Sequence, residues 1–128
     1  MPDIACGIRE YGLAEFAKRV QASYMSHWLR LGLYDEEVEG WGQAFTQAVE
    51  RTLQAGGRIH FSLNGLDLAK ALRGDPELFT GRYMAYELQQ ILLHESWFVR
   101  TVFYLDDEIL SAEKLELAKI RPRGRTQN

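Results

Sequence analysis

Polar side chains that could do acid–base chemistry alternate with apolar ones in the stretch GRIHFSLNG, residues 57–65. The polar positions are Arg58, His60 and Ser62. This period of two predicts a β-strand with one face on the core and one face open. A histidine changes charge near neutral pH, so His60 is the candidate acid or base on the open face. The alternative for His60 is a structural, hydrogen-bonded histidine.

A second strand is predicted over 97–105, WFVRTVFYL, because the stretch is rich in β-branched and aromatic residues. Arg100 and Tyr104 fall on the same face of that strand. If it pairs with the strand over 58–63 and its other face meets the helices, Arg100 and Tyr104 join His60 on the open face. The alternative is that both residues only contact their cross-strand neighbours.

A polar ridge is predicted on a helix over 81–95, where Tyr83, Glu87, Gln90 and His94 share one flank. Glu87 and His94 are seven residues apart, which corresponds to about 10 Å of helix rise, so they could flank a ligand. Tyr83 and His94 then join Arg58 and Ser62 as substrate-binding residues. The alternatives are a solvated Glu87 and a His94 that stabilises the helix end.

The order of the expected elements predicts an α+β fold, with two N-terminal helices followed by a mostly antiparallel sheet with an inserted helix. A single α+β domain over 1–120 precedes a basic flexible tail over 121–128. The expected elements are a helix from Leu13 to about Leu31, a helix with an apolar stripe from Val38 to Leu53, the strand over 58–63, a helical piece over 66–74, the helix over 81–95, the strand over 97–105, a hairpin turn at Asp106-Asp107, and a segment over 111–120 that fits a strand or a helix.

Composition limits the possible classes of protein. The 128 residues suit one domain with one core, and 46% hydrophobic and 26% charged residues are ordinary for a globular protein. Cys6 is the only cysteine, which excludes an internal disulfide and paired-cysteine zinc sites. There is no apolar run of about 18 residues and no secretion signal. These features, with the absence of metal and nucleotide motifs, predict a cytoplasmic protein with no metal, cofactor or membrane partner.

A family resemblance rests on four features between residues 57 and 110. They are an x-F-x-L-x-G element at 60–65, a glycine-containing loop, a helix opening near Thr80 and Gly81 that carries Tyr-Glu-Leu at 86–88, and a T-x-F-Y strand at 101–104. In this order they resemble the C-terminal effector module of bacterial polymorphic toxins of the contact-dependent and Rhs types. The Asp106-Asp107 turn departs from the small or glycine turn of many members. The resemblance implies an antibacterial toxin that acts in the target-cell cytosol and is neutralised by a cognate immunity protein.

Within that resemblance, a metal-free ribonuclease accounts best for the open face. His60 would be the base or acid, Arg100 the cation at the phosphate, and Glu87 or His94 the second acid–base group. Tyr104 would hold the phosphate or stack on a base. The net charge of −3 counts against a nuclease. One alternative is a toxin that consumes NAD or transfers ADP-ribose, with a glutamate at the oxocarbenium charge. Another is a non-enzymatic immunity or adaptor protein that uses the acidic cluster at 35–39.

Overall fold

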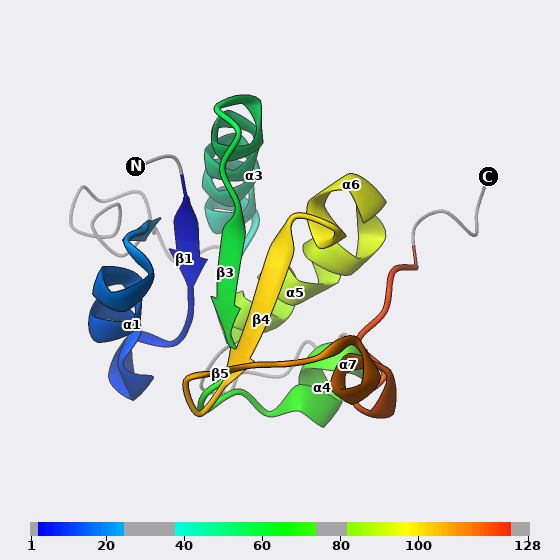
Figure 1. Cartoon of the computed structure of the whole chain (residues 1–128). Coiled ribbons are helices and arrows are strands. Elements are labelled where there is room, and N and C mark those ends of the chain that lie inside the picture. The colour runs from blue at the N-terminus through cyan, green and yellow to red at the C-terminus, as the bar shows by residue number, and fades with distance from the viewer. Residues whose placement is uncertain (1–2, 25–37, 74–81, 124–128) are drawn as a thin grey trace.

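The computed structural model describes residues 3–24, 38–73 and 82–123. Strands and helices follow one another along the described chain, and their arrangement is drawn in Figure 1. The elements are β1 (Ile4–Cys6), a 3-10 turn (Arg9–Tyr11), α1 (Leu13–Val20), β2 (Ser23–Tyr24), α3 (Val38–Gln54), β3 (Ile59–Ser62), α4 (Leu68–Arg73), α5 (Arg82–Leu93), α6 (Glu95–Phe98), β4 (Thr101–Leu105), β5 (Glu108–Ile109) and α7 (Ala112–Leu117).

The sheet is mixed and mostly parallel, so the expected antiparallel sheet behind two N-terminal helices is wrong. Its strand order is β2-β1-β3-β4-β5, and the chain enters the sheet with β1 before any α-helix. The pairs β1·β2, β1·β3 and β3·β4 are parallel, and only β5 runs antiparallel to β4. β3 therefore lies at the centre of the sheet, with a parallel neighbour on each side.

The connections explain the parallel pairing. Parallel neighbours need a crossover of a dozen or more residues, and such crossovers are usually helical. α1 connects β1 to β2, and α3 precedes β3. The segment from β3 to β4 contains α4, α5 and α6, so its length alone rules out a tight hairpin between these two strands.

Two apolar layers cover opposite faces of the sheet (Figure 1). On one face, α3 and α5 pack against the strand residues Ile59, Phe61 and Phe103, all of them buried. On the other face, α1 places Phe16 against Tyr104 and contacts the β1 strand. The face that alternation predicted to be open is thus partly covered by α1, and His60 and Ser62 are buried beneath it, 8% and 6% exposed.

The first predicted helix begins at Leu13 as expected but ends at Val20, eleven residues early. Gln21 adopts the left-handed conformation, with φ of 58°. The Gln21 N–H donates to Lys18 O and the Ala22 N–H donates to Ala17 O, which is the Schellman pattern of helix ends. Glycine is the usual residue at that position, so the sequence carries no recognisable stop signal here. Residues 25–37 lie outside the described chain.

The predicted strand over 97–105 is wrong in its first half. Residues 95–98 form α6, and only Thr101–Leu105 form β4. Trp97 is buried and packs edge-on against Phe45 of α3, with ring centroids 6.1 Å apart. The Thr101 hydroxyl donates to the Trp97 carbonyl, which ties the end of α6 to the start of β4. An aromatic side chain that anchors a helical turn looks the same in sequence as one in a strand.

Most other elements are confirmed. The helix before Gly56-Gly57, the strand over 58–63, the helical piece after the Asn64-Gly65 turn, the helix from Arg82 and the hairpin at Asp106-Asp107 are all present. The ambiguous segment over 111–120 forms α7, and the Ser111 side chain caps its N-terminus by accepting a hydrogen bond from the Lys114 N–H.

The end of the described chain is attached to the body of the domain. Arg123, which the sequence places in the tail, donates its backbone N–H to Leu92 O at 2.7 Å. Its guanidinium donates to Gln89 Oε1 at 2.9 Å and to Leu72 O at 2.8 Å. The packed structure therefore extends at least to Arg123, and residues 124–128 lie outside the described chain.

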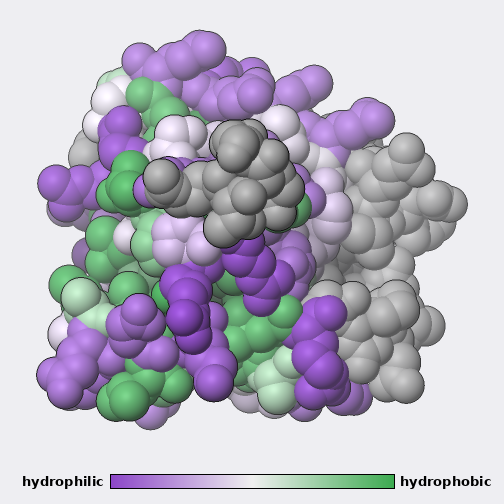
Figure 2. Space-filling view, turned by 90° about the vertical axis from the view of Figure 1, so that its right-hand side faces the viewer, coloured by the Kyte–Doolittle hydropathy of each residue, from purple (hydrophilic) through white to green (hydrophobic). Residues whose placement is uncertain are grey.

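No helix among the described residues is long and apolar enough to cross a membrane. On the face drawn in Figure 2, hydrophobic surface occurs as separate patches among hydrophilic side chains. The most exposed large apolar side chains, Val99, Ile109 and Leu117, belong to different parts of the fold. Single exposed apolar residues are ordinary on protein surfaces, so they identify no partner.

Candidate functional site

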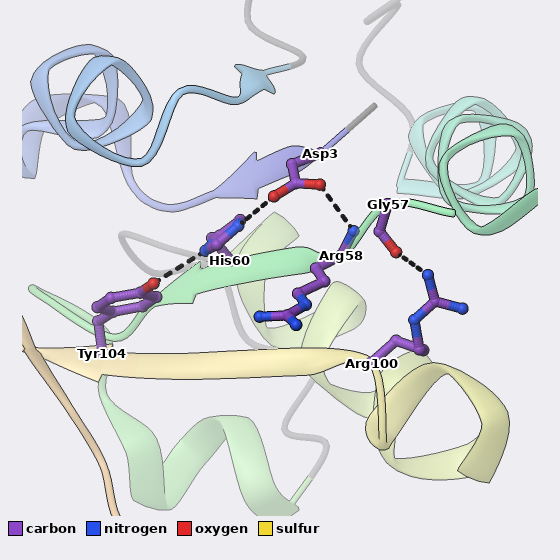
Figure 3. A network of polar contacts seen from close by, with 6 residues as sticks. All are labelled: Asp3, Gly57, Arg58, His60, Arg100 and Tyr104. Carbon is purple, nitrogen blue, oxygen red and sulfur yellow. Dashed lines mark hydrogen bonds and ion pairs between the residues drawn. The ribbon is translucent and has the colours of Figure 1, made fainter. Parts of the chain in front are cut away.

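A line of three hydrogen-bonded side chains runs across the sheet (Figure 3). His60 Nε2 lies 2.7 Å from Asp3 Oδ2, and His60 Nδ1 lies 2.9 Å from the Tyr104 hydroxyl. Asp3 immediately precedes β1, His60 is in β3 and Tyr104 is in β4. The line thus joins three neighbouring strands, and His60 occupies its centre with both ring nitrogens engaged.

Strand register brings these residues together. Ala5 pairs with His60 and Ser62 pairs with Tyr104, so side chains two residues before Ala5 and at His60 share a face. The start of β1 is fixed to β3 by backbone bonds, since the Ile4 N–H donates to Arg58 O. The Arg58 N–H donates to Asp3 Oδ1 at 3.0 Å. The Asp3 carboxylate therefore holds the strand end and the imidazole at once.

The pKa of Asp3 is displaced by this setting. Burial alone would raise the pKa of this carboxyl, but the hydrogen bonds from His60 and from the Arg58 N–H, together with the charges of both residues, lower it below 3.8. Asp3 is therefore an anion at neutral pH and favours a proton on His60 Nε2.

Tyr104 is the half-buried outer member of the line. Its ring packs edge-on against Phe16 of α1, with centroids 4.9 Å apart. Burial raises the pKa of the Tyr104 phenol, and the nearby Asp3 carboxylate raises it further, whereas the Arg58 charge lowers it. The phenol therefore keeps its proton at neutral pH.

One arrangement of protons allows proton transfer along this line. With its proton on Nε2, a neutral imidazole would donate to Asp3 and would accept at Nδ1 from the Tyr104 O–H. Tyr104 oxygen can then accept a proton from an outside group while passing its own proton to His60, and Asp3 stabilises the resulting imidazolium. The arrangement is a proton relay, in which Tyr104 contacts the outside group and His60 exchanges protons with that group through the Tyr104 hydroxyl.

The two predicted arginines lie at different places. Arg58 is exposed and precedes His60 by two residues, so it shares that face, and its charge acts on both Asp3 and Tyr104. Arg100 instead donates to the carbonyl of Gly57, two residues before β3, and points away from Tyr104 in Figure 3. The expected catalytic cation is therefore engaged with the backbone, and Arg58 is the arginine beside the relay.

The predicted helix ridge does not reach the relay. Glu87 is buried on α5, on the face of the sheet opposite His60, close enough to Cys6 for its charge to raise the pKa of that thiol, which burial already raises. His94 lies beyond the end of α5, donates Nδ1–H to Gln90 O at 2.8 Å and stacks on Trp97 at 4.3 Å. The side chain of Tyr83 lies outside the described residues.

Ser62 lies on the predicted face but is buried, and its hydroxyl accepts a long 3.4 Å hydrogen bond from the Asn64 N–H. Its role is in the turn after β3.

The sequence pattern does not reveal Asp3, because β1 was not expected and an acid near the N-terminus has no periodic signal. Among the described residues, no three His, Cys, Asp or Glu side chains cluster closely enough to hold a metal ion. Of the acidic cluster at 35–39, residues 35–37 and the side chain of Glu39 also lie outside the described chain.

Replacing Asp3 with alanine is expected to lower the free energy of unfolding by about 1–3 kcal/mol at pH 7, because buried His60 Nε2–H loses its acceptor. A carboxylate with a lowered pKa stabilises the fold above its unfolded pKa of 3.8 and loses this contribution as pH falls through its folded pKa. The difference between wild type and Asp3→Ala should therefore shrink below about pH 4. Urea unfolding at pH 7 and at pH 3 measures it.

Asp107→Asn is the control for this experiment. Asp107 pairs with Arg19 at 2.5 Å, but both side chains are more than half exposed, so the loss should stay below about 1 kcal/mol. An Asp3→Ala loss that is equally small, or that does not depend on pH, would contradict the role of Asp3 in holding His60.

Comparison of the chain with protein-family models, curated proteins and solved structures finds no match. A functional assignment for this chain therefore depends on its own geometry.

Proposed function

We propose that the chain is a toxin domain that cleaves single-stranded RNA without a metal ion, through Tyr104 and His60. The observation that supports this proposal is the hydrogen-bonded line from Asp3 through His60 to a half-buried Tyr104. The relay places an imidazole nitrogen behind the Tyr104 hydroxyl as a proton acceptor, and Arg58 is an exposed cation beside it. RNA carries its own nucleophile, the 2′-hydroxyl, so a base and a cation are the groups it needs from the protein.

In the proposed reaction, the 2′-oxygen forms a bond to the adjacent phosphorus and the bond from phosphorus to the 5′-oxygen breaks. The 2′-hydroxyl proton passes to Tyr104 oxygen while the Tyr104 proton passes to His60 Nδ1. Solvent protonates the leaving 5′-oxygen, and the proton on His60 returns to solvent through Tyr104. The products are a 2′,3′-cyclic phosphate and a 5′-hydroxyl.

The raised pKa of Tyr104 is compatible with this route. A free phenolate would be costly at neutral pH, but in the relay the phenol gains one proton as it gives up another. Asp3 offsets the cost of the buried imidazolium. Arg58 faces the charge that develops on the phosphate.

The other functions considered from the sequence have less support. NAD or ADP-ribose chemistry was expected to combine a strand-borne histidine with a glutamate. Glu87, the glutamate singled out from the sequence, lies on the opposite face of the sheet from His60. An acidic binding protein would need neither the relay nor a half-buried phenol. As part of the proposal, the toxin acts in the target-cell cytosol and is neutralised by a cognate immunity protein.

The test is incubation of the full chain with a single-stranded RNA oligonucleotide in the presence of EDTA. We expect fragments with cyclic phosphate ends, and we expect the same oligonucleotide made of DNA to remain intact. Tightly induced expression in bacteria should arrest growth, and His60→Ala at matched folded yield should relieve the arrest. Intact RNA with falling NAD in arrested cells would replace the proposal with dinucleotide chemistry. No cleavage and no arrest would favour the binding protein.

A further inference from the structure

Tyr11 is an aromatic side chain that the proposed reaction does not use. The Tyr11 side chain is 53% exposed, although large aromatic side chains of this kind are often buried in a core. Its ring lies directly against Gly65, where an added Cβ would come within 2.4 Å of the ring atoms Cδ1 and Cγ. Gly65 also has φ of +78°, a conformation that favours glycine. The turn after β3 therefore accommodates the Tyr11 ring, and more than half of the side chain stays open.

This ring lies at the carboxyl ends of the parallel strands. Tyr11 follows β1 and precedes α1, and Gly65 follows β3. The chain leaves β1 through α1 on one face of the sheet and reaches β3 after α3 on the other face. The crossovers thus change face between β1 and β3. In open sheets of parallel strands, ligands bind outside the carboxyl ends at this position.

Two short connections link the ring to the relay. The Leu63 N–H, two residues before Gly65, donates to the Tyr104 carbonyl at 2.8 Å. Phe16, five residues after Tyr11, packs against the Tyr104 ring. The Tyr11 ring is therefore connected to Tyr104 both through the turn after β3 and through the start of α1.

We propose that Tyr11, seated on Gly65, is a stacking platform for an unpaired base of the RNA, an inference that rests on the proposed function. An unpaired base offers a flat aromatic face, which an exposed tyrosine ring can stack against. Stacking tolerates every base, so the platform adds affinity without strong sequence preference. The platform holds the RNA strand while Arg58 contacts a phosphate and Tyr104 contacts a 2′-hydroxyl.

The experiment measures binding separately from cleavage. The probe is a fluorescent 2′-O-methyl RNA octamer, which lacks the 2′-hydroxyl nucleophile and is not cleaved. We expect Tyr11→Ala to weaken its binding by about 5- to 150-fold, the range for losing one stacked base. Tyr11→Phe keeps the ring and should keep the affinity. Gly65→Ala displaces the ring and should lose affinity as Tyr11→Ala does, while Leu117→Ala, 77% exposed on α7, should bind as wild type does.

Cleavage kinetics give the second readout. Tyr11→Ala should raise KM for RNA and leave kcat at saturating RNA within about twofold, as expected when only uniform binding is lost. RNA cleavage by the wild type with unchanged binding by Tyr11→Ala overturns the platform and leaves the proposed function standing. Octamer binding that needs Tyr11, without RNA cleavage, supports the platform and overturns the ribonuclease. Neither binding nor cleavage by the wild type overturns both.

Discussion

Tyr104→Phe is expected to lower the rate of RNA cleavage by about 10²- to 10⁴-fold, the usual contribution of a positioned acid–base group. The substitution removes only the hydroxyl that lies 2.9 Å from His60 Nδ1. The ring remains to pack against Phe16, so the fold should be retained. Without the hydroxyl, His60 Nδ1 loses the group through which it would reach the 2′-hydroxyl, and Nε2 remains bonded to Asp3. Single-turnover cleavage of one RNA oligonucleotide at saturating protein measures the rate.

Tyr86→Phe is the matched control for this change. Tyr86 lies on α5, with its hydroxyl against Gly42 of α3, on the opposite side of the sheet. The same hydroxyl is deleted, yet cleavage should stay within about twofold of wild type. Equal cleavage by Tyr104→Phe and wild type would show that the phenol does not touch the reacting atoms. The relay would then be a structural hydrogen-bond network.

The part of the site that the sequence predicts depends on strand periodicity. Alternation along 58–63 and 97–105 places His60, Arg58 and Tyr104 on one face, and this result does not depend on whether the strands are parallel or antiparallel. The structure brings these residues together, with β3 and β4 as neighbours. Periodicity gives the face of each side chain but not its partner, which is why Arg100 was expected at the site although it binds the Gly57 carbonyl.

The helix ridge failed for a different physical reason. Helical spacing shows that Glu87 and His94 share a flank of one helix, but it carries no information about which layer the helix joins. α5 packs on the face with Ile59 and Phe61, opposite the relay. Glu87 is only 3% exposed there, although its polarity suggested a solvated or catalytic position.

The main error in the predicted fold was the direction of strand pairing, and it arose because β1 was not predicted. Ile4, Ala5 and Cys6 are all buried, because the strand is covered on both faces, so the segment shows no alternation. Without β1, the predicted elements are helices followed by strands, an order that favours hairpins and an antiparallel sheet. The long helical segment between β3 and β4 was visible in the sequence and already favoured a parallel crossover over an antiparallel pair.

Because the sheet is covered on both faces, side chains of its central strand contribute strongly to the free energy of unfolding. Phe61 is fully buried in β3 and packs against Phe103 of β4, with ring centroids 5.6 Å apart. We expect Phe61→Ala to lower the free energy of unfolding by about 3–5 kcal/mol, through lost burial and the cavity that remains. That is a large share of the roughly 5–15 kcal/mol that stabilises a domain. The milder Phe61→Leu, at roughly 1–2 kcal/mol, keeps the comparison measurable if the alanine variant does not fold.

Urea unfolding followed by tryptophan fluorescence measures both variants, because Trp97 lies in the same core as Phe61. Leu117→Ala is the control: its side chain is 77% exposed on α7, and its loss should stay within about 0.5 kcal/mol. A central strand with a parallel neighbour on each side must unfold with the whole sheet, so the Phe61 variants should shift the unfolding midpoint and leave its slope unchanged. A Phe61→Ala loss as small as that of Leu117→Ala would contradict the burial of Phe61 in the core, and with it the packing that holds β3 and the relay in place.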